Sequence, residues 1–322
     1  MTKPSAPEFW NRSGLMAHLL EPAAWTHARI GAARWALTRP WRASVPIVCV
    51  GNIVAGGAGK TPVVLTIAAR LRRAGLTVHL LSRGYGGRAA GPLAVDPALH
   101  GAVEVGDEPL LLARAAPTWV ARDRAAGALA ALNAGAGLIV MDDGFQNPSL
   151  SKDLSLLVID AAYGFGNGRV IPAGPLREPI AGALKRADAV VLLGPEEVPV
   201  RALLGRRPLI EARLVPQKLP RLDRPVVAFA GIGRPKKFFR MLAAAGAEIA
   251  ACHAFPDHHP YRADELARIE RPGATLVTTA KDWVRLPLAW RARVEVLEIA
   301  VDWQDEAALD ALLLPMVERA RG

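Results

Sequence analysis

A glycine-rich run, GNIVAGGAGKTP at residues 51–62, constrains the fold of this chain more than any other feature. It follows VPIVCV at 45–50, a short apolar run typical of a buried strand. It leads into TPVVLTIAARLRRAG, which has the composition of a helix with proline in its first turn and glycine at its end. A glycine-rich turn between a strand and a helix is the setting of a phosphate-binding loop, and an ordinary strand-to-helix turn is the alternative.

The loop supplies the two side chains that phosphate chemistry requires. The ammonium of Lys60 can bridge to a transferred phosphate, and the hydroxyl of Thr61 can hold Mg²⁺. The usual pattern G-x-x-x-x-G-K-[ST] would place a glycine at position 54, where this chain has Val54. The loop therefore matches the pattern incompletely and has the shorter form AGGAGKT. We expect the nucleotide to be held by the residues of this loop, which are Val54, Ala55, Gly56, Gly57, Ala58, Gly59, Lys60 and Thr61.

The rest of the chain alternates short β-rich runs with helical segments from residue 45 onward, which predicts an α/β fold with a mainly parallel sheet. Three prolines and several charges in VPQKLPRLDRP indicate a linker, and a second alternating unit follows it. The predicted organisation is an N-terminal helix region at 1–44, a domain carrying the phosphate loop at 45–215, a linker at 216–225, and a smaller α/β domain at 226–322.

A pair of carboxylates follows another apolar run. LIVMDDG places Asp142 and Asp143 at the end of a predicted strand, where a carboxylate can reach Mg²⁺ directly or through water. On its own, Asp-Asp-Gly would be read as a polar turn. Together with the phosphate loop, the pair becomes a predicted metal contact.

Two further sites hold candidate acid–base residues. Asp107 in GDEP precedes a predicted helix, so it is either an N-cap or a general base. Asp257, His258 and His259 follow a predicted strand of the second unit, where a metal site is the alternative. Adjacent residues point apart and no third ligand of suitable spacing follows, so we favour a histidine that is hydrogen-bonded across the two units to a carboxylate.

The N-terminal region combines cations with tryptophans. The formal net charge of +10 suits nucleic acid, anionic lipid or a phosphorylated substrate, and the charge alone does not choose among them. Residues 1–44 hold four of the eight tryptophans, and Leu15 and Leu19 recur at helical spacing. Such a helix can lie in a bilayer interface, or it can pack on the protein's own core. The basic residues of the region are Lys3, Arg12, Arg29, Arg34, Arg39 and Arg42.

Other features of the composition narrow the setting. The two cysteines, Cys49 and Cys252, lie far apart in apolar stretches and build neither a disulfide framework nor a four-ligand zinc site. The start of the chain lacks a leader pattern, and no run of about 18 apolar residues occurs. We therefore expect a protein of the reducing cytoplasm that does not span a membrane.

Taken together, the motifs resemble the tetraacyldisaccharide 4'-kinase family of lipid A biosynthesis in Gram-negative bacteria. Several of the motifs are long and specific, and their order along the chain is that of the family. They are GNIVAGGAGKTP (51–62), LSRGYGG (81–87), VGDEP (105–109), DDGFQN (142–147), PAGPLREP (172–179), VVAFAGIGRPKKFF (226–239), FPDHH (255–259) and TTAKD (278–282).

This resemblance implies a reaction and a set of roles. The reaction is transfer of phosphate from ATP, with Mg²⁺, to the 4'-hydroxyl of an acylated glucosamine disaccharide 1-phosphate, which gives the bisphosphorylated lipid A precursor lipid IVA at the cytoplasmic face of the inner membrane. The fold is two α/β/α sandwich domains that close by a hinge. The first is similar to P-loop NTPases and carries the phosphate loop and the acceptor site, and the second, smaller domain helps to hold the nucleotide and Mg²⁺. The implied roles are acceptor activation by Asp107 with His258 as its partner, Mg²⁺ binding and catalysis by Asp142 and Asp143, contact with the transferred phosphate by Lys60 and Arg177, and nucleotide contact by Gln146.

The resemblance also changes the interpretation of the N-terminal region, and the sequence departs from the family pattern at one position. A lipid acceptor requires the enzyme to reach the membrane, so residues 1–44 become a predicted membrane dock of a monomer that binds no nucleic acid. Asn147 stands where the family usually has histidine, so an imidazole role is not expected there. A membrane-peripheral P-loop ATPase acting as a nucleotide switch remains the alternative, although Ala55 replaces the signature lysine of such switches.

Overall fold

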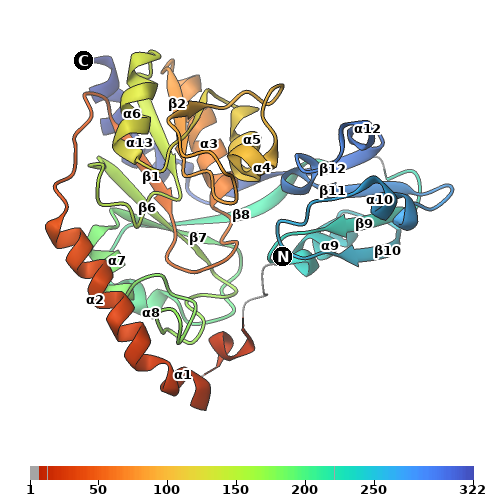
Figure 1. The fold of residues 1–322 in the computed structure, drawn as a ribbon, viewed down its shortest axis with the longest axis horizontal. Helices are drawn as coiled ribbons and strands as arrows, with labels where there is room; N and C mark the ends of the chain where they lie inside the picture. The colour runs from red at the N-terminus through yellow and green to blue at the C-terminus, as the bar shows by residue number, and fades with distance from the viewer. Residues whose placement is uncertain (1–6, 13, 221) are drawn as a thin grey trace.

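The computed structural model describes residues 7–12, 14–220 and 222–322 (Figure 1). Residues 1–6, with Lys3, and residue 13 of the expected membrane dock lie outside the described residues, as does residue 221 of the expected linker. The strands are β1 Ile47–Gly51, β2 Val78–Ser82, β3 Leu93–Ala94, β4 Thr118–Val120, β5 Leu138–Asp142, β6 Leu154–Asp160, β7 Ala189–Leu193, β8 Leu209–Lys218, β9 Val226–Ala230, β10 Ile249–Ala254, β11 Thr275–Thr279 and β12 Val294–Trp303. The helices are the 3₁₀ helix η1 Glu8–Asn11 and the α-helices α1 Leu15–Leu19, α2 Glu21–Leu37, α3 Lys60–Arg73, α4 Ala102–Val105, α5 Asp107–Ala113, α6 Arg124–Asn133, α7 Ile180–Arg186, α8 Arg201–Leu204, α9 Pro235–Ala244, α10 Ala263–Ile269, α11 Ala280–Trp283, α12 Leu288–Arg291 and α13 Glu306–Arg321.

The described strands form a single sheet in the order β10-β9-β11-β12-β8-β7-β6-β1-β5-β2-β4-β3. All neighbours run parallel except β12 with β8 and β3 with β4. The prediction of an α/β fold with a mainly parallel sheet is therefore confirmed. Because parallel strands end at the same edge, the loops after β1, β5 and β6, which are adjacent strands, converge on one side of the sheet.

Alternate residues of β1 show how both faces of the sheet are covered. Val48 and Val50 pack in a cluster with the apolar face of α3, whereas Ile47 and Cys49 pack in another cluster with the alanines of α6. Successive side chains of a strand point to opposite faces, so α3 and α6 lie on opposite sides of the sheet. Burial on both faces explains the continuous apolar runs that the sequence shows in these strands.

The C-terminal helix packs on the first unit, the predicted domain at 45–215, although the sequence analysis placed it in the second unit at 226–322. Leu309, Leu313 and Met316 of α13 pack in the same core cluster as α3, and Arg70 of α3 pairs with Asp310. In Figure 1 the C-terminus accordingly lies beside α6, far from β9 and β10. The assignment of all of 226–322 to one smaller domain is wrong for this helix, because an apolar stripe shows that a helix packs on a core without showing on which core.

The predicted linker also begins later than expected. Strand β8 runs through Lys218, so residues 216–218 of the predicted linker 216–225 are strand. β8 pairs antiparallel with the second half of β12, with Val215 opposite Ala300 and Ala212 opposite Trp303. A proline lacks an N–H group but can stand at an irregularity of a ladder, as Pro216 does where the register of this pair shifts.

Helices α1 and α2 lie along the outside of the first unit (Figure 1). Few of their residues are buried, and their large apolar side chains are exposed, with Leu15 at 77% and Trp25 at 64%. Toward the C-terminal end of α2, Trp35 packs under the guanidinium of Arg186 at 4.4 Å, and Arg169 pairs with Glu21 at the other end. The helix is thus held at both ends while its middle faces solvent. None of the described helices is both long and apolar enough to cross a bilayer.

Candidate active site

The glycine-rich loop leaves β1 and enters α3 as the sequence predicts. Gly59, the residue before α3, has a φ of 79°, and Gly56 has a φ of 110°, both in the left-handed region that glycine adopts without strain. The backbone N–H of Ala55 donates to the carbonyl of Pro175, which holds the start of the loop. The side of Gly56 and Gly57 is open, since a Cβ added at either would meet nothing within 4 Å.

Lys60 lies at the first position of α3 with its side chain 9% exposed. Its ammonium donates to Oδ1 of Asn52 at 3.0 Å and lies 3.5 Å from Oδ1 of Asp143. The loop, the helix start and the end of β5 thus meet at this ammonium. Asn52 is a residue that the sequence reasoning missed, and its place inside the quoted motif was the available signal. Thr61 follows in the same turn of α3 and is half-buried.

Asp143 joins Lys60 to the segment that follows β6. Both carboxylate oxygens accept from Nη1 of Arg177, at 2.9 and 2.8 Å. The same guanidinium lies 3.3 Å from Oε1 of Gln146, whose amide nitrogen donates to the carbonyl of Asn52 at 2.8 Å. Burial alone would raise the pKa of Asp143, but the charges of Lys60 and Arg177 lower it to about 2. The structure therefore brings Lys60, Asp143, Arg177 and Gln146 together.

Asp142 is the buried carboxylate of the pair. Its side chain is 0% exposed, and neither oxygen has a hydrogen-bond partner among the described residues. Burial, with the negative charges of Glu108 and Asp143, raises its pKa well above the ordinary value. A buried carboxylate without partners fits a bound cation, which would supply the missing charge.

Among residues 7–12, 14–220 and 222–322, no group of three or more His, Cys, Asp or Glu side chains could hold a metal ion. This agrees with the donor set at the loop, because Mg²⁺ in phosphate sites takes one or two carboxylates, a hydroxyl, water and the phosphates themselves. The predicted alternative of a metal site at Asp257, His258 and His259 gains no support.

Asp107 and His258 come from different units and meet at 2.9 Å, Oδ2 to Nδ1. Asp107 is the first residue of α5, and its side chain is 2% exposed. Its other oxygen accepts from the N–H of Glu108 at 3.0 Å, so it also makes a local helix-start contact. Burial would raise the pKa of Asp107, but the hydrogen bond to His258 and the charges of Lys281 and Arg285 lower it to about 2.

Backbone geometry marks the same two places. Asp143, with a φ of 52°, and His258, with a φ of 61°, are the non-glycine residues with positive φ in the described part of the chain. Such conformations cost of order 1 to 3 kcal/mol and persist where the surroundings enforce them. The neighbouring His259 makes a different contact. Its Nε2 lies 3.0 Å from Oε2 of Glu265, a residue in the first turn of α10.

The ion pairs around Asp107 continue into a network that the sequence reasoning missed. Nε of Arg285 lies 3.4 Å from Asp107, and its Nη2 donates to Asp282 at 2.7 Å and to the carbonyl of Gly231 at 2.9 Å. Asp282 is fully buried and also accepts from the hydroxyl of Tyr261 at 2.7 Å. Asp282 is the last residue of the TTAKD motif. Arg285 lay three residues beyond it, and only the fold shows that it faces Asp107.

Asn147, which departs from the family pattern, is tied into its own turn. Its side-chain oxygen accepts from the N–H of Ser149 at 3.1 Å, the hydroxyl of Ser149 at 3.0 Å and the N–H of Leu150 at 3.2 Å. These are bonds of an Asx turn, and they leave the amide oxygen facing the backbone of 149–150. Asn147 therefore supports the loop after β5 through its own turn.

The charge of Asp107 gives a prediction about acid stability. Its pKa is about 2 in the folded protein against 3.8 as the ordinary value, so its pairing stabilises the fold above about pH 4 and the stabilisation is lost as pH falls toward 2. The shift corresponds to about 2 kcal/mol. We expect the difference in free energy of unfolding between wild type and Asp107→Asn, measured by urea titration, to shrink between pH 4 and pH 2. A difference that stays constant over this range would contradict the pairing.

The fold and this site define a P-loop kinase. The family model described as "Tetraacyldisaccharide-1-P 4'-kinase" matches residues 16–318. The chain therefore belongs to the tetraacyldisaccharide 4'-kinase family, which confirms the resemblance seen in the motifs, and it is classed with lipid kinases.

Similar proteins cover almost the whole chain. The tetraacyldisaccharide 4'-kinase of Rhodospirillum centenum is 56% identical over 325 residues, covering 97% of this chain and 96% of its own. That of Gluconacetobacter diazotrophicus is 53% identical over 324 residues, covering 98% of this chain and 99% of its own. Among solved structures, LpxK from Aquifex aeolicus in complex with ATP is 29% identical with a TM-score of 0.80, over 94% of this chain and 100% of that one.

Proposed function

We propose that this protein transfers a phosphate from ATP to the 4'-hydroxyl of an acylated glucosamine disaccharide 1-phosphate, giving the 1,4'-bisphosphate, lipid IVA. The observation that carries the proposal is an open phosphate loop near an Asp–His pair contributed by two units, with Asp107 buried and His258 half-buried. A Cβ added at Gly233 would lie 3.7 Å from the backbone nitrogen of Gly57 and 3.8 Å from Oδ2 of Asp257. That oxygen lies 3.8 Å from Nε2 of His258, so the pair lies near the loop. Family membership supports the nature of the acceptor.

The loop residues 54–61 bind the phosphates of ATP through backbone N–H groups and the start of α3. Lys60 neutralises charge on the transferred group, and Arg177 lies on the other side of Asp143, where a second cation assists. The residues that would hold Mg²⁺ are Asp142 and Thr61, with Asp143 contacting it directly or through water. When bound, Mg²⁺ would neutralise charge on the phosphates during transfer.

The acceptor hydroxyl is activated by the Asp107–His258 pair acting as a unit. A carboxylate with a pKa of about 2 is by itself a weak base, and Asp107 is nearly inaccessible. His258 has its Nδ1 on Asp107, which leaves Nε2 as the outer atom of the pair, 3.8 Å from Asp257. Asp107 fixes the ring and its tautomer, and the proton of the hydroxyl passes to the pair as the phosphate is transferred.

A lipid acceptor gives the N-terminal helices a role. Exposing acyl chains to water costs about 0.8 kcal/mol per methylene, so the enzyme works at the surface of the membrane. The exposed apolar side chains of α1 and α2 suit insertion at headgroup depth, and the cations of the region suit anionic lipid. We propose that residues 1–44 dock on the cytoplasmic side of the inner membrane and that the enzyme is a peripheral monomer without nucleic-acid partners.

The docking proposal predicts the effect of three substitutions together. Leu15→Asp, Leu19→Asp and Trp25→Ala remove exposed apolar surface without touching the contacts that anchor α2, so the fold should survive. We expect the fraction that cosediments with anionic vesicles to fall about tenfold or more. The control is Leu288→Asp on the second unit, which is about as exposed as Leu15. Equal partitioning of the triple variant and wild type would contradict the proposal.

One assay tests the reaction against its alternative. Purified protein is incubated with γ-labelled ATP, Mg²⁺ and the acylated disaccharide 1-phosphate in mixed micelles, and the label is followed. We expect label on the lipid. Release of labelled phosphate without labelled lipid would instead support a membrane-peripheral ATPase that acts as a nucleotide switch.

A further inference from the structure

We propose that Arg234, carried by the second unit, binds the β- and γ-phosphates of the nucleotide in the phosphate loop, and that Asp160 and Tyr163 position it there. This rests on the proposed function only in taking ATP as the nucleotide. Arg234 is the residue before α9, in the loop after β9. Asp160 ends β6, the strand next to β1, so it lies at the edge of the sheet where the phosphate loop lies. Arg234 reaches that edge through its contact with Asp160.

The guanidinium of Arg234 is held from two directions. Its Nη1 donates to Oδ2 of Asp160 at 2.7 Å, and its central carbon lies 4.2 Å from the centre of the Tyr163 ring. Asp160 is itself fixed, because it is 7% exposed and its Oδ1 accepts from the N–H of Ala162 at 3.2 Å. A carboxylate and an aromatic face together orient a planar guanidinium, which an ammonium would not require.

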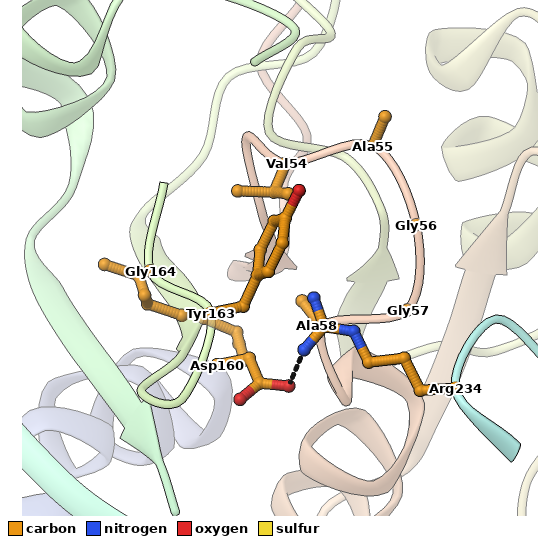
Figure 2. A pocket seen from close by; sticks show the side chains of 11 residues that line it. Val54, Ala55, Gly56, Gly57, Ala58, Asp160, Tyr163, Gly164 and Arg234 are labelled. Carbon is orange, nitrogen blue, oxygen red and sulfur yellow. Dashed lines mark hydrogen bonds and ion pairs between the residues drawn. The ribbon is translucent and has the colours of Figure 1, made fainter. Parts of the chain in front are cut away.

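Arg234 and the loop line the same small hollow, which is partly open to solvent. Figure 2 shows the backbone of Val54 to Ala58 curving along one side of it, with Asp160 and Tyr163 on the other. Arg234 enters beside Gly57 and reaches past Ala58 to Asp160. The second unit comes close to the loop itself, since a Cβ added at Gly233 would lie 3.7 Å from the backbone nitrogen of Gly57.

The donors of Arg234 are only partly used. Within the described residues, the bond to Asp160 is the one hydrogen bond that its guanidinium donates, and the side chain is 37% exposed. A guanidinium has five N–H groups in a fixed fork, so it can keep the carboxylate and still donate to phosphate oxygens. Lys237, one helical turn further, adds a second positive charge 3.5 Å from Asp160. The backbone amides of the loop, from the first unit, and the side chains of Arg234 and Lys237, from the second, would therefore contact the same nucleotide phosphates.

Nucleotide binding without lipid tests the inference. Calorimetric titrations of ATP, ADP and AMP, with Mg²⁺, are compared for wild type, Arg234→Ala, Arg234→Lys and the matched control Lys236→Ala, which removes an exposed cation of the same turn. We expect Arg234→Ala to weaken ATP and ADP about tenfold or more and AMP much less. Arg234→Lys should recover part of the loss, and Lys236→Ala should bind as wild type.

Two results would overturn the role of Arg234. One is ATP affinity of Arg234→Ala equal to that of Lys236→Ala, and the other is an equal loss for all three nucleotides. For the positioning role, Asp160→Asn should weaken ATP binding in the wild type and leave it unchanged in the Arg234→Ala background, and equal losses in both would overturn it. If these differences hold while the wild type transfers no phosphate to lipid, the proposed function fails and the phosphate contact stands.

Discussion

Lys60→Ala is expected to lower kcat for phosphate transfer to the lipid by roughly 10² to 10³-fold while leaving the protein folded. The ammonium is buried between Asn52 and Asp143, at the start of α3, and in the proposed reaction it neutralises charge on the transferred group. Its removal leaves Asp143 paired with Arg177, so no carboxylate there becomes unpaired. The measurement is kcat with saturating lipid together with the melting temperature of each protein.

Lys185→Ala is the matched control for this variant, because it removes an exposed lysine at the end of α7. Normal turnover is expected for it. A Lys60→Ala protein that turns over at the wild-type rate would remove the phosphate-loop assignment. If the Lys60→Ala protein lost both its activity and its melting transition, Lys60 would be required for folding, and a catalytic role would be contradicted.

The Asp107–His258 pair gives the second large effect. We expect His258→Ala and Asp107→Asn each to lower kcat by roughly 10² to 10⁴-fold with little change in ATP affinity. Because the two side chains meet at 2.9 Å and act as one unit, the double variant should lose hardly more than the worse single variant.

The double-mutant comparison separates this role from a structural one. If Asp107 only started the α5 helix, Asp107→Asn would lower the melting temperature and leave the kcat of the folded protein unchanged. If the two side chains acted independently, their losses would multiply. His259→Ala is the control for the histidine, since His259 contacts Glu265 outside the pair.

The elements around the loop could be predicted from sequence because their signals are local. A buried strand, a glycine-rich turn and a helix with Lys60 at its start follow each other within 27 residues, 47–73, and each has its own composition. Asp142 and Asp143 were found for the same reason, at the end of an apolar strand. The likeness of the motifs to a known family supplied the pairing of Asp107 with His258, which their separation in the chain does not reveal.

Contacts between distant segments could not be predicted in this way. Arg285 and Arg234 lie in stretches rich in arginine, where one charge looks like another, and only the fold brings them to Asp107 and Asp160. Strand β8 was hidden by the prolines of a predicted linker, and the partner of α13 depends on packing rather than on periodicity.

The antiparallel pairing of β8 with β12 bears on how the two halves of the molecule can move. The chain leaves the first unit along β8 and returns to it along β12. The two units are therefore connected by a ribbon of two hydrogen-bonded strands. A double ribbon bends across its width more easily than it shears along its length, because sliding one strand past the other would break the ladder between them. Any swing that opens the nucleotide site would therefore bend this ribbon, and it would carry Arg234 away from Asp160 and the phosphate loop.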